Sequence, residues 1–491
     1  MSDTVLLAID QGTSSTRCIA FSPDGALLGN EQQEFAQIYP QPGWVEHDPE
    51  LLWNTSLSTA RQVLSHHGSK VAAIGLANQR ETVVLWDRET GQALHNAIVW
   101  QDRRTAELCR KLAADGFEPE LAEKTGLRLD PYFSATKLAW MLEAIPGARD
   151  AARAGKLACG TVDSFLIWRL TGGRSHVTDA TNASRTALYD IRKNQWDPAL
   201  CEAFGVPMAL LPEVRDSASD FGTTDMVSFG YKLPIRGVAG DQQAALVGHA
   251  CFAPGEAKST YGTGAFLVVN SGGTLLRSKN NLLSTIAYRI NGETTYALEG
   301  SILSAGATIQ WLRDGLGLFV KASETEALAR SVADSGGVYL VPAFAGLGAP
   351  YWDPEARGAL VGLTRGSGRG EIVRAGIDST AFQTRDLLDA MAADGIEPRL
   401  LKVDGGMTAN LLLMERLADI LGVPVLRPKV AETTAFGAAC LAGLGCGLYS
   451  SLDEISGFWQ ADQRCDPNID EATRAQEIEG WRRAVSRVTT L

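Results

Sequence analysis

Apolar runs that end in short polar turns alternate with helical stretches along the chain. The first run, Val5–Phe21, is broken after Asp10 by glycine, threonine and serine, so it predicts two strands joined as a hairpin. A strand over Ala26–Phe35 and a helix from Asp48-Pro49 to about Leu64 follow. Further strands are predicted over 71–77, 82–86, 97–100, 235–239, 265–270, 295–298, 338–341 and 400–403, and further helices over 103–114, 134–142, 162–170, 304–316 and 369–391. The alternation predicts an α/β fold.

A second hairpin of the same kind occurs about half a chain later. From Lys258 the sequence reads KSTYGTGAFLVVN, which predicts a strand, a Gly262-Thr263-Gly264 tip and a returning strand, Ala265–Asn270. Two similar hairpins in two halves of one chain suggest related domains that close on one nucleotide. That arrangement is typical of the actin-like (ribonuclease H-like) ATPase fold, which places a nucleotide cleft between the domains.

The tip of the first hairpin concentrates groups that suit a phosphate. Backbone N–H groups, the hydroxyls of Thr13, Ser14 and Ser15, and the guanidinium of Arg17 face one carboxylate, Asp10. Such a set suits phosphate on one side and a hydrated divalent ion on the other. The tip has neither the Gly-Lys-Ser/Thr of a Walker A loop nor a G-x-G-x-x-G fingerprint. A polar turn without a ligand is the alternative.

The chain length of 491 residues predicts two domains of about 240 residues each. Pro254-Gly255 interrupts the pattern after Cys251, so we place the boundary there, with domains over 1–252 and 253–491. The most apolar late stretch, Ala435–Tyr449, is rich in glycine and alanine and shorter than a membrane span. It predicts a tightly packed helix.

Charge and cysteine usage exclude several functions. The formal net charge is −12 without a basic block, which argues against nucleic acid or an anionic membrane as a partner. The eight cysteines form no C-x-x-C and the six histidines have no metal-ligand spacing. The first residues, MSDTVLLAID, do not have the pattern of a signal peptide. We therefore expect a cytoplasmic protein with reduced thiols.

Polar residues at the ends of predicted strands are candidates for a cleft. Arg80, Glu81 and Trp100 occupy such positions, where a sheet presents side chains to a ligand. Asp241 lies between a strand and a helix, where an aspartate is also a common helix N-cap. A Gly405-Gly406 turn after the strand at 400–403 could bring bare backbone to a phosphate or ribose.

The chain resembles the FGGY family of carbohydrate kinases over nearly its whole length, and within that family the members that act on glycerol. The resemblance rests on long matches in one order: IDQGTSSTR, YPQPGWVEHDP, NQRET, AIVWQDRRT, DPYFSATK, TNASRT, GDQQAAL, STYGTGAF, LEGSI, AGATIQWLRD, VPAFAGLGAPYWDPEARG, TRD and VDGGMTANLLL.

The resemblance assigns roles to the two hairpin tips and to a nucleotide site. It implies that Asp10 binds magnesium through water and that Thr263 contacts the ATP phosphates from the second domain. The β- and γ-phosphates would be held by Thr13, Ser14, Ser15 and Arg17, and the adenosine would be framed by Gly306, Gln310, Gly406 and Asn410.

The resemblance also implies an acceptor pocket. A small polyol needs charged hydrogen-bonding partners and aromatic walls. The polar partners would be Arg80, Glu81, Tyr132, Asp241 and Gln242, and the walls Trp100 and Phe266, which without the resemblance would be interpreted as core aromatics. Asp241 would act as general base, and the helix N-terminus next to it predicts that its carboxylate form is favoured.

The implied activity is transfer of phosphate from ATP to glycerol. The alternatives are a kinase for another small polyol or triose, such as dihydroxyacetone, erythritol or a pentulose, and an actin-like ATPase switch without kinase activity. The family resemblance also implies a homo-oligomer, a dimer or tetramer. The segment Phe229–Pro234 lacks the arginines with which some relatives bind a sugar bisphosphate, and 221–240 contains no histidine for activating phosphorylation. We therefore expect constitutive activity.

Overall fold

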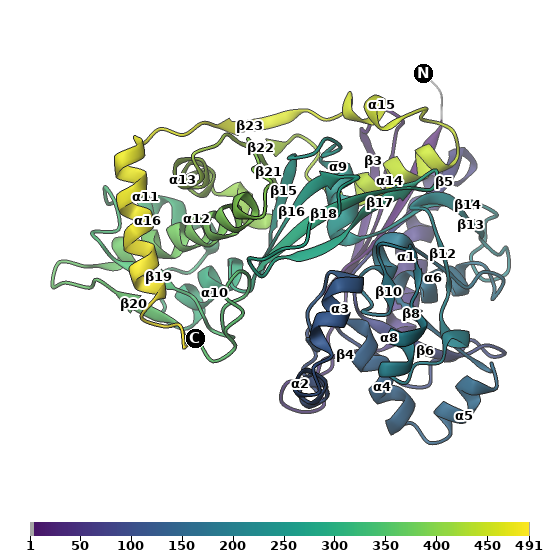
Figure 1. The fold of residues 1–491 in the computed structure, drawn as a ribbon. Coiled ribbons are helices and arrows are strands. Elements are labelled where there is room, and N and C mark those ends of the chain that lie inside the picture. Colours follow the sequence, from purple (N-terminus) through teal and green to yellow (C-terminus); the bar gives the residue numbers. More distant parts are fainter. Residues whose placement is uncertain (1–3, 491) are drawn as a thin grey trace.

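The computed structural model describes residues 4–490, which form two lobes, each built around a twisted mixed sheet (Figure 1). The six-stranded sheet of the first half has the order β13-β14-β5-β1-β2-β3. Its strands are β1 (Val5–Gln11), β2 (Ser15–Phe21), β3 (Leu27–Glu34), β5 (Val71–Asn78), β13 (Ala218–Thr223) and β14 (Pro234–Gly240). The first three strands are antiparallel neighbours, whereas β5 runs parallel to both β1 and β14.

The second half repeats this arrangement. Its seven-stranded sheet has the order β17-β18-β16-β15-β21-β22-β23. The strands are β15 (Ala257–Tyr261), β16 (Ala265–Gly272), β17 (Leu283–Ile290), β18 (Glu293–Ile302), β21 (Leu401–Asp404), β22 (Val425–Pro428) and β23 (Ala461–Cys465). As in the first sheet, a hairpin (β15, β16) is followed by an antiparallel third strand, and β15, β21 and β22 run parallel. The predicted α/β fold with an internal repeat is therefore confirmed.

Four small sheets accompany the two central sheets among the described residues. One has the order β4 (Glu46–His47), β7 (Ala97–Ile98), β6 (Val83–Asp87) and β8 (Leu157–Thr161), and the others pair β9 (Val177–Asp179) with β12 (Glu213–Arg215), β10 (Tyr189–Asp190) with β11 (Gln195–Trp196), and β19 (Tyr339–Val341) with β20 (Ala359–Val361).

The helices surround these sheets. Those of the first half are α1 (Pro49–His67), α2 (Ala106–Ala114), α3 (Glu118–Thr125), α4 (Ser134–Ala144), α5 (Ala148–Arg153), α6 (Val162–Leu170), α7 (Ala180–Ala183), α8 (Pro198–Ala203) and α9 (Asp241–Gly248), with the 3₁₀ turns η1 (Gly68–Lys70) and η2 (Met208–Leu210). Those of the second half are α10 (Gly306–Asp314), α11 (Thr325–Arg330), α12 (Arg369–Ala393), α13 (Leu411–Leu421), α14 (Thr433–Gly445), α15 (Leu452–Ser456) and α16 (Glu471–Val485), with η3 (Ala322–Glu324) and η4 (Gly406–Ala409).

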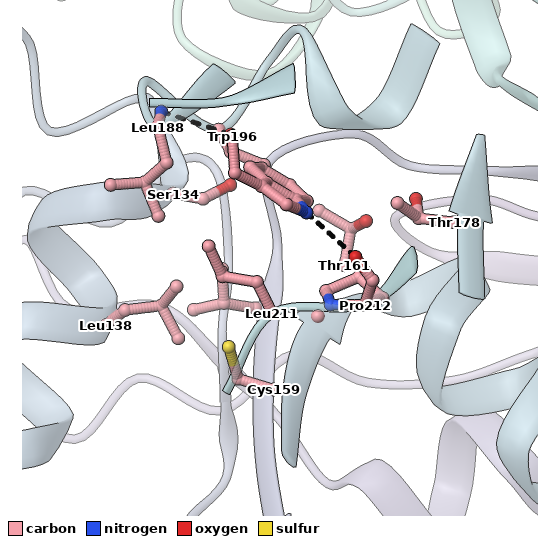
Figure 2. Close-up of a pocket in the computed structure, with 12 residues that line it drawn as sticks. Ser134, Leu138, Cys159, Thr161, Thr178, Leu188, Trp196, Leu211 and Pro212 are labelled. Carbon is pink, nitrogen blue, oxygen red and sulfur yellow. Dashed lines mark hydrogen bonds between the residues drawn. The ribbon is translucent and has the colours of Figure 1, made fainter. Parts of the chain in front are cut away.

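The core of the first half is closely packed between its sheets and helices. A cavity of only about 10 Å³ lies there. Figure 2 shows Leu138, Leu211 and Cys159 among the residues that line it. The indole of Trp196 beside it donates to the carbonyl oxygen of Pro212 over 2.8 Å. This space is no larger than a water molecule, so it is not a substrate site.

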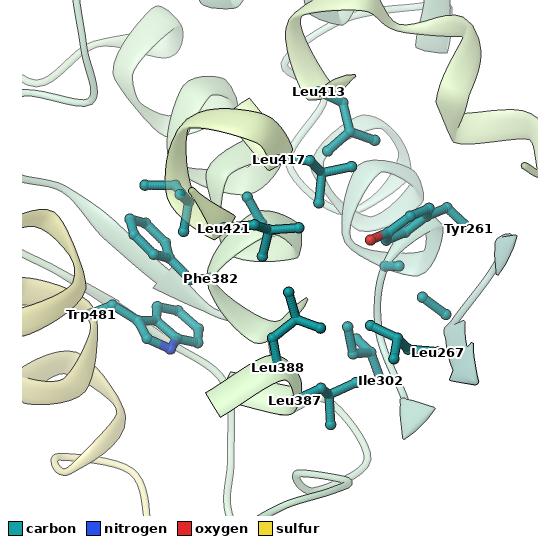
Figure 3. Packing of buried hydrophobic residues seen from close by; sticks show 14 of the residues in the cluster. Tyr261, Leu267, Ile302, Phe382, Leu387, Leu388, Leu413, Leu417, Leu421 and Trp481 are labelled. Atoms are coloured by element: carbon teal, nitrogen blue, oxygen red, sulfur yellow. The ribbon is translucent and has the colours of Figure 1, made fainter. Parts of the chain in front are cut away.

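The core of the second half is centred on α12. Ile377, Phe382 and Leu387 of this helix are buried, while Ile372 remains partly accessible. Phe382 stacks on Trp481 of α16 with ring centroids 5.4 Å apart (Figure 3). This contact docks the C-terminal helix onto the second lobe.

The two halves share a third core built on α9 and α14. Helix α14, from the second half, packs across β1, β5 and β14 of the first sheet (Figure 1). Gly437 faces the backbone of Ala244 in α9, and a Cβ at that glycine would overlap the carbonyl oxygen of Ala244. Of the glycine- and alanine-rich stretch at 435–449, residues 435–445 form a packed helix as predicted, and the last four residues follow its end. The small side chains let two helix backbones approach closely.

Most predicted elements agree with the structure to within a few residues. The helix predicted from Gln242 begins at Asp241, so Gly240 and not Asp241 is its N-cap. The sequence reasoning did not predict the short helices α3, α5, α7, α8 and α15 or the strands β17, β22 and β23. These segments are short, and their positions depend on packing rather than on a strong local pattern.

Candidate active site

The first hairpin tip lies next to groups from both halves. Gly12 closes the turn through its N–H, which donates to the carbonyl oxygen of Ser15 over 2.9 Å. The indole Nε1 of Trp100 donates to Thr13 Oγ1 over 3.0 Å. Arg17 Nη1 forms an ion pair of 2.7 Å with Glu432, which directly precedes α14 of the second half. The guanidinium predicted to bind phosphate is thus already engaged by a carboxylate.

Asp10 lies at the end of β1 where negative charges converge. Burial raises the pKa of Asp10 to about 7, and Asp241 and Glu432 add to this while Arg17 opposes it. A carboxyl group with a raised pKa between other carboxylates is a place where a cation would be favourable. Across residues 4–490 no three His, Cys, Asp or Glu side chains group as a complete metal site. The residues therefore fit magnesium held by one or two carboxylates, phosphates and water.

Arg80 is the centre of a buried charge cluster at the end of β5. Its side chain is 2 % exposed, and its Nε lies 3.3 Å from Asp241 Oδ1 and 3.8 Å from Glu81 Oε1. Nη2 also lies 3.5 Å from the hydroxyl of Tyr132. Four of the residues predicted for the acceptor pocket are therefore brought together.

Glu81 and Arg185 complete the cluster on the side of the first half. Glu81 has a positive φ of 61°, which residues other than glycine rarely adopt. The carboxylate is therefore positioned by an uncommon backbone conformation. Its Oε1 accepts from Arg185 Nε over 2.6 Å. Arg185 follows α7, and its side chain is completely buried.

The aromatic side chains predicted as pocket walls also converge. The ring of Trp100 is 5.7 Å from that of Tyr132 and 6.2 Å from that of Phe266, both in edge-to-face contact. Phe266 is in β16, two residues after the second hairpin tip. The contact between Trp100 and Phe266 therefore joins the two halves beside the charge cluster.

Asp241 is the first residue of α9, and its side chain is 28 % exposed. Its Oδ1 accepts from the N–H of Gln242 over 2.7 Å. Burial raises the pKa of Asp241, although Arg80 and Lys258 oppose the shift. The net shift is opposite to the one expected from the helix N-terminus, because desolvation outweighs the nearby cations and the hydrogen bond from Gln242.

Gln242 faces away from Arg80 toward the second half. Its side-chain oxygen accepts from Lys258 Nζ, which also donates to Thr260 Oγ1 over 3.0 Å. Lys258 lies on β15, the strand that leads into the second hairpin tip. The second hairpin is thereby connected to the residue that follows Asp241.

A cavity of about 470 Å³ lies in the second half. All five residues predicted there for the nucleotide line it: Thr263, Gly306, Gln310, Gly406 and Asn410. Gly306 is close to the second tip, because its N–H donates to the carbonyl oxygen of Gly262 over 2.9 Å. The volume and the mixed polar and apolar walls are suitable for a nucleoside.

The sequence reasoning missed several residues of this region. Arg185, Glu299 and Lys258 belong to the charge cluster, and Arg313, Thr325 and Glu326 line the cavity. Glu299 gave a local signal, because it is a charged residue within the apolar strand Ala297-Leu298-Glu299-Gly300. Ser14 and Ser15 remain at the first tip and, like Thr13 and Arg17, do not line the 470 Å³ cavity.

Comparisons with known proteins identify the class to which this fold and site belong. The model of the N-terminal domain of the FGGY family of carbohydrate kinases matches residues 5–248, and that of the C-terminal domain matches residues 257–446. The chain belongs to the FGGY family of carbohydrate kinases.

Within this family, the chain is similar to individual glycerol kinases. The chain is 58 % identical over 487 residues to a glycerol kinase of Alcanivorax borkumensis, with 98 % of each chain covered. It is 57 % identical over 488 residues to a glycerol kinase of Methylobacterium nodulans, covering 98 % of this chain and 97 % of the relative. The crystal structure of Plasmodium falciparum glycerol kinase with ADP superimposes with a TM-score of 0.94 at 36 % identity, covering 99 % of this chain and 98 % of that one.

Helices long and apolar enough to cross a membrane are not found between residues 4 and 490.

Proposed function

We propose that this protein transfers the γ-phosphoryl group of ATP to glycerol and releases sn-glycerol 3-phosphate and ADP. The observation that carries the proposal is the buried cluster of Arg80, Glu81 and Asp241 beside the aromatic rings of Trp100 and Phe266. A three-carbon polyol presents hydroxyls to charged groups and C–H edges to rings, which is the chemistry of this site.

The acceptor residues would orient one terminal hydroxyl for attack. Glu81 and Asp241 accept hydrogen bonds from hydroxyl groups and Arg80 donates to one of them, while Trp100 and Phe266 limit the space along the carbon chain. Asp241 takes the proton as the oxygen–phosphorus bond forms and the bond to ADP breaks. Because burial raises the pKa of Asp241, it is a stronger base than an exposed aspartate.

The nucleotide would span the two halves. The adenosine fits the 470 Å³ cavity with Gly306, Gln310, Gly406 and Asn410, and Thr263 at its edge would contact the phosphates. The β- and γ-phosphates would be held by Thr13, Ser14, Ser15 and Arg17. Arg17 would then either break its ion pair with Glu432 or contact Glu432 and a phosphate at the same time. Asp10 would hold magnesium through water. Magnesium, when bound, offsets negative charge on the transferred phosphoryl group.

An ADP-release assay with a panel of acceptors tests this proposal. We expect turnover with glycerol to exceed turnover with erythritol and xylulose, because Trp100 and Phe266 bound the site along the carbon chain. Turnover with dihydroxyacetone should also be lower, because it has a carbonyl where glycerol has its middle hydroxyl. Preference for one of the other acceptors would assign the enzyme to a different substrate. Release of ADP at the same rate without any acceptor would indicate an ATPase switch instead.

Three further expectations remain proposals: the domain boundary and the compartment rest on the sequence pattern, and the oligomeric state rests on the family. We place the domain boundary between residues 252 and 253, beside Pro254-Gly255. We also propose a cytoplasmic homo-oligomer, a dimer or tetramer. Light scattering coupled to gel filtration would determine the number of subunits, and a monomer at micromolar concentration would contradict the oligomer.

A further inference from the structure

Glu299 is a buried carboxylate that the second half places inside the acceptor site of the first half. It lies on β18, and its side chain has no exposed surface. Its Oε2 is 2.5 Å from Arg80 Nη1, and its Oε1 is 3.0 Å from Arg80 Nη2. The same Oε1 accepts from Arg185 Nη2 over 3.0 Å. One carboxylate thus binds two arginines across the interface between the halves.

This contact determines which edge of the Arg80 guanidinium is free. Both terminal nitrogens are directed toward Glu299, as expected for a bidentate pair. Only Nε is directed toward Asp241 and Glu81, at 3.3 and 3.8 Å. Asp241 and Glu81 therefore keep oxygen atoms that are not consumed by Arg80.

The neighbouring arginines favour the ionised form of Glu299. Burial raises the pKa of Glu299, but Arg185 and Arg80 outweigh it and hold the pKa at about 2. A buried carboxylate without such partners would become neutral. Within the cluster of Arg80, Arg185, Glu81, Glu299 and Asp241, Glu299 is the carboxylate that accepts hydrogen bonds from both arginines.

We propose that Glu299 is a positioning residue for the acceptor: it fixes Arg80 and Arg185 so that Glu81 and Asp241 remain available to the polyol hydroxyls. The proposal rests on the proposed function of this site. Without Glu299, Arg80 turns its terminal nitrogens to Asp241 and Glu81, the nearest carboxylates. Those oxygens then bind arginine instead of the acceptor.

The position of Glu299 on β18 also couples the acceptor site to the second half. β18 belongs to the same sheet as β15 and β16, which carry Lys258 and Phe266. A displacement of this sheet withdraws Glu299 from Arg80 and Phe266 from Trp100 together. The acceptor site is therefore complete only while the two halves are in contact.

The test compares steady-state kinetics of Glu299→Gln and Glu293→Gln with the wild type. Glu293 is the exposed first residue of the same strand, so its variant controls for the substitution itself. We expect Glu299→Gln to raise the KM for glycerol by about tenfold or more, the usual scale for unpairing a buried charge. The KM for ATP should stay within about twofold, because residues 4–490 give Glu299 no hydrogen bond or ion pair to the walls of the 470 Å³ cavity.

A second variant and a second measurement separate positioning from misfolding. Glu299→Asp keeps the charge and should recover part of the glycerol affinity. Hydrogen exchange of the backbone N–H groups at 79–82 should accelerate in Glu299→Gln and not in Glu293→Gln, with or without substrates. An unchanged glycerol KM and unchanged exchange, or equal rises in the KM for glycerol and for ATP, would overturn the proposal.

The same experiment distinguishes this proposal from the proposed function. If the wild type prefers another polyol, the assignment to glycerol fails, and the KM ratio for that polyol still tests Glu299. If the wild type phosphorylates glycerol but Glu299→Gln has the same KM, only the positioning role fails. If no acceptor is phosphorylated, the proposed function fails. Faster hydrogen exchange at 79–82 in Glu299→Gln than in Glu293→Gln would then still support the positioning of Arg80 by Glu299, and unchanged exchange would overturn it.

Discussion

At the residue scale, the site contains two kinds of side chain. Some were predicted as site residues from the sequence, and others were recognised only from their contacts in the folded protein. Arg80, Glu81 and Asp241 were predicted as one acceptor set, and the structure places both carboxylates within 3.8 Å of Arg80 Nε. Arg185 and Glu299 lie far from them in the sequence and contact them only after folding. The types of the acceptor residues could be predicted from the sequence, but the contacts that orient their side chains could not.

Replacing Asp241 by asparagine should reduce turnover by about 10²–10⁴-fold, because the general base is removed while the hydrogen-bonding shape is nearly kept. Nucleotide binding should survive, since Asp241 does not line the 470 Å³ cavity. Steady-state turnover and ADP titration calorimetry measure the two effects. Asp462→Asn, on the half-exposed side chain that pairs with Arg427, is the matched control and should retain full turnover. Near wild-type turnover of Asp241→Asn would remove Asp241 from this role.

At the element scale, two helices decide how the parts of the molecule fit together. Helix α14 crosses from the second half onto the first sheet and packs on α9 through glycine and alanine. Helix α16 docks on α12 through Trp481, which stacks on Phe382 and donates to Asp386 Oδ2 over 2.8 Å. The sequence predicted helices at the positions of α14 and α12, but not which surfaces these helices cover.

A methyl group at Gly437 should disrupt the contact between α14 and α9. Because a Cβ there would overlap the backbone of Ala244, Gly437→Ala should lower the free energy of unfolding by about 2 kcal/mol or more. Chemical unfolding followed by fluorescence measures the loss. Gly273→Ala is the control, since a Cβ at Gly273 has open space around it. Equal stability of the two variants would show that the helix contact can relax at little cost.

The docking of α16 should depend on pH through Asp386. Burial raises the pKa of Asp386 from its ordinary value of 3.8 to about 7, although Trp481 and Tyr351 oppose the shift. In the unfolded chain this group ionises near pH 4, so the folded state loses stability as the pH rises from about 4 to about 7. Asp386→Asn removes this dependence.

Thermal unfolding of wild type and Asp386→Asn at pH 5 and pH 8 measures the effect. We expect the Tm difference to shift in favour of the variant at pH 8. Asp389→Asn, three residues further on the same helix and about 31 % exposed, should show no such shift. A Tm difference that is the same at both pH values would contradict the assignment to Asp386.

At the scale of the whole molecule, the two lobes repeat one sheet topology and meet along a charged and aromatic interface. Contacts between Trp100 and Phe266, Arg80 and Glu299, and Arg17 and Glu432 all join the first half to the second. The residues proposed for the acceptor come mainly from the first half, and the cavity proposed for adenosine lies in the second. The arrangement of the lobes therefore decides whether a donor and an acceptor meet.

Sugar bisphosphates should not regulate the enzyme. In the segment 229–234, Phe229 is buried, and its carbonyl oxygen accepts from Arg61 Nε over 3.2 Å. The hydroxyl of Tyr231 donates to the carbonyl oxygen of Leu64 over 3.3 Å. This segment carries one lysine and no arginine, so it offers a weak anion site. Millimolar fructose 1,6-bisphosphate should leave turnover unchanged, with ADP as the positive control for inhibition. Strong inhibition would contradict this expectation.

The sequence by itself determined most strands of the first sheet, several strands of the second, most of the longer helices and the two hairpin tips, because these follow from local apolar periodicity and turn chemistry. It also determined the candidate residues, because their type and their place at strand ends are local properties. The tertiary structure alone decided that Glu299 binds Arg80, that Glu432 binds Arg17 and that α14 covers the first sheet. Each of these contacts joins residues more than 200 positions apart, or helices to distant strands, so it depends on how whole sheets pack. Desolvation in that packing, which a linear sequence does not display, also raised the pKa of Asp241.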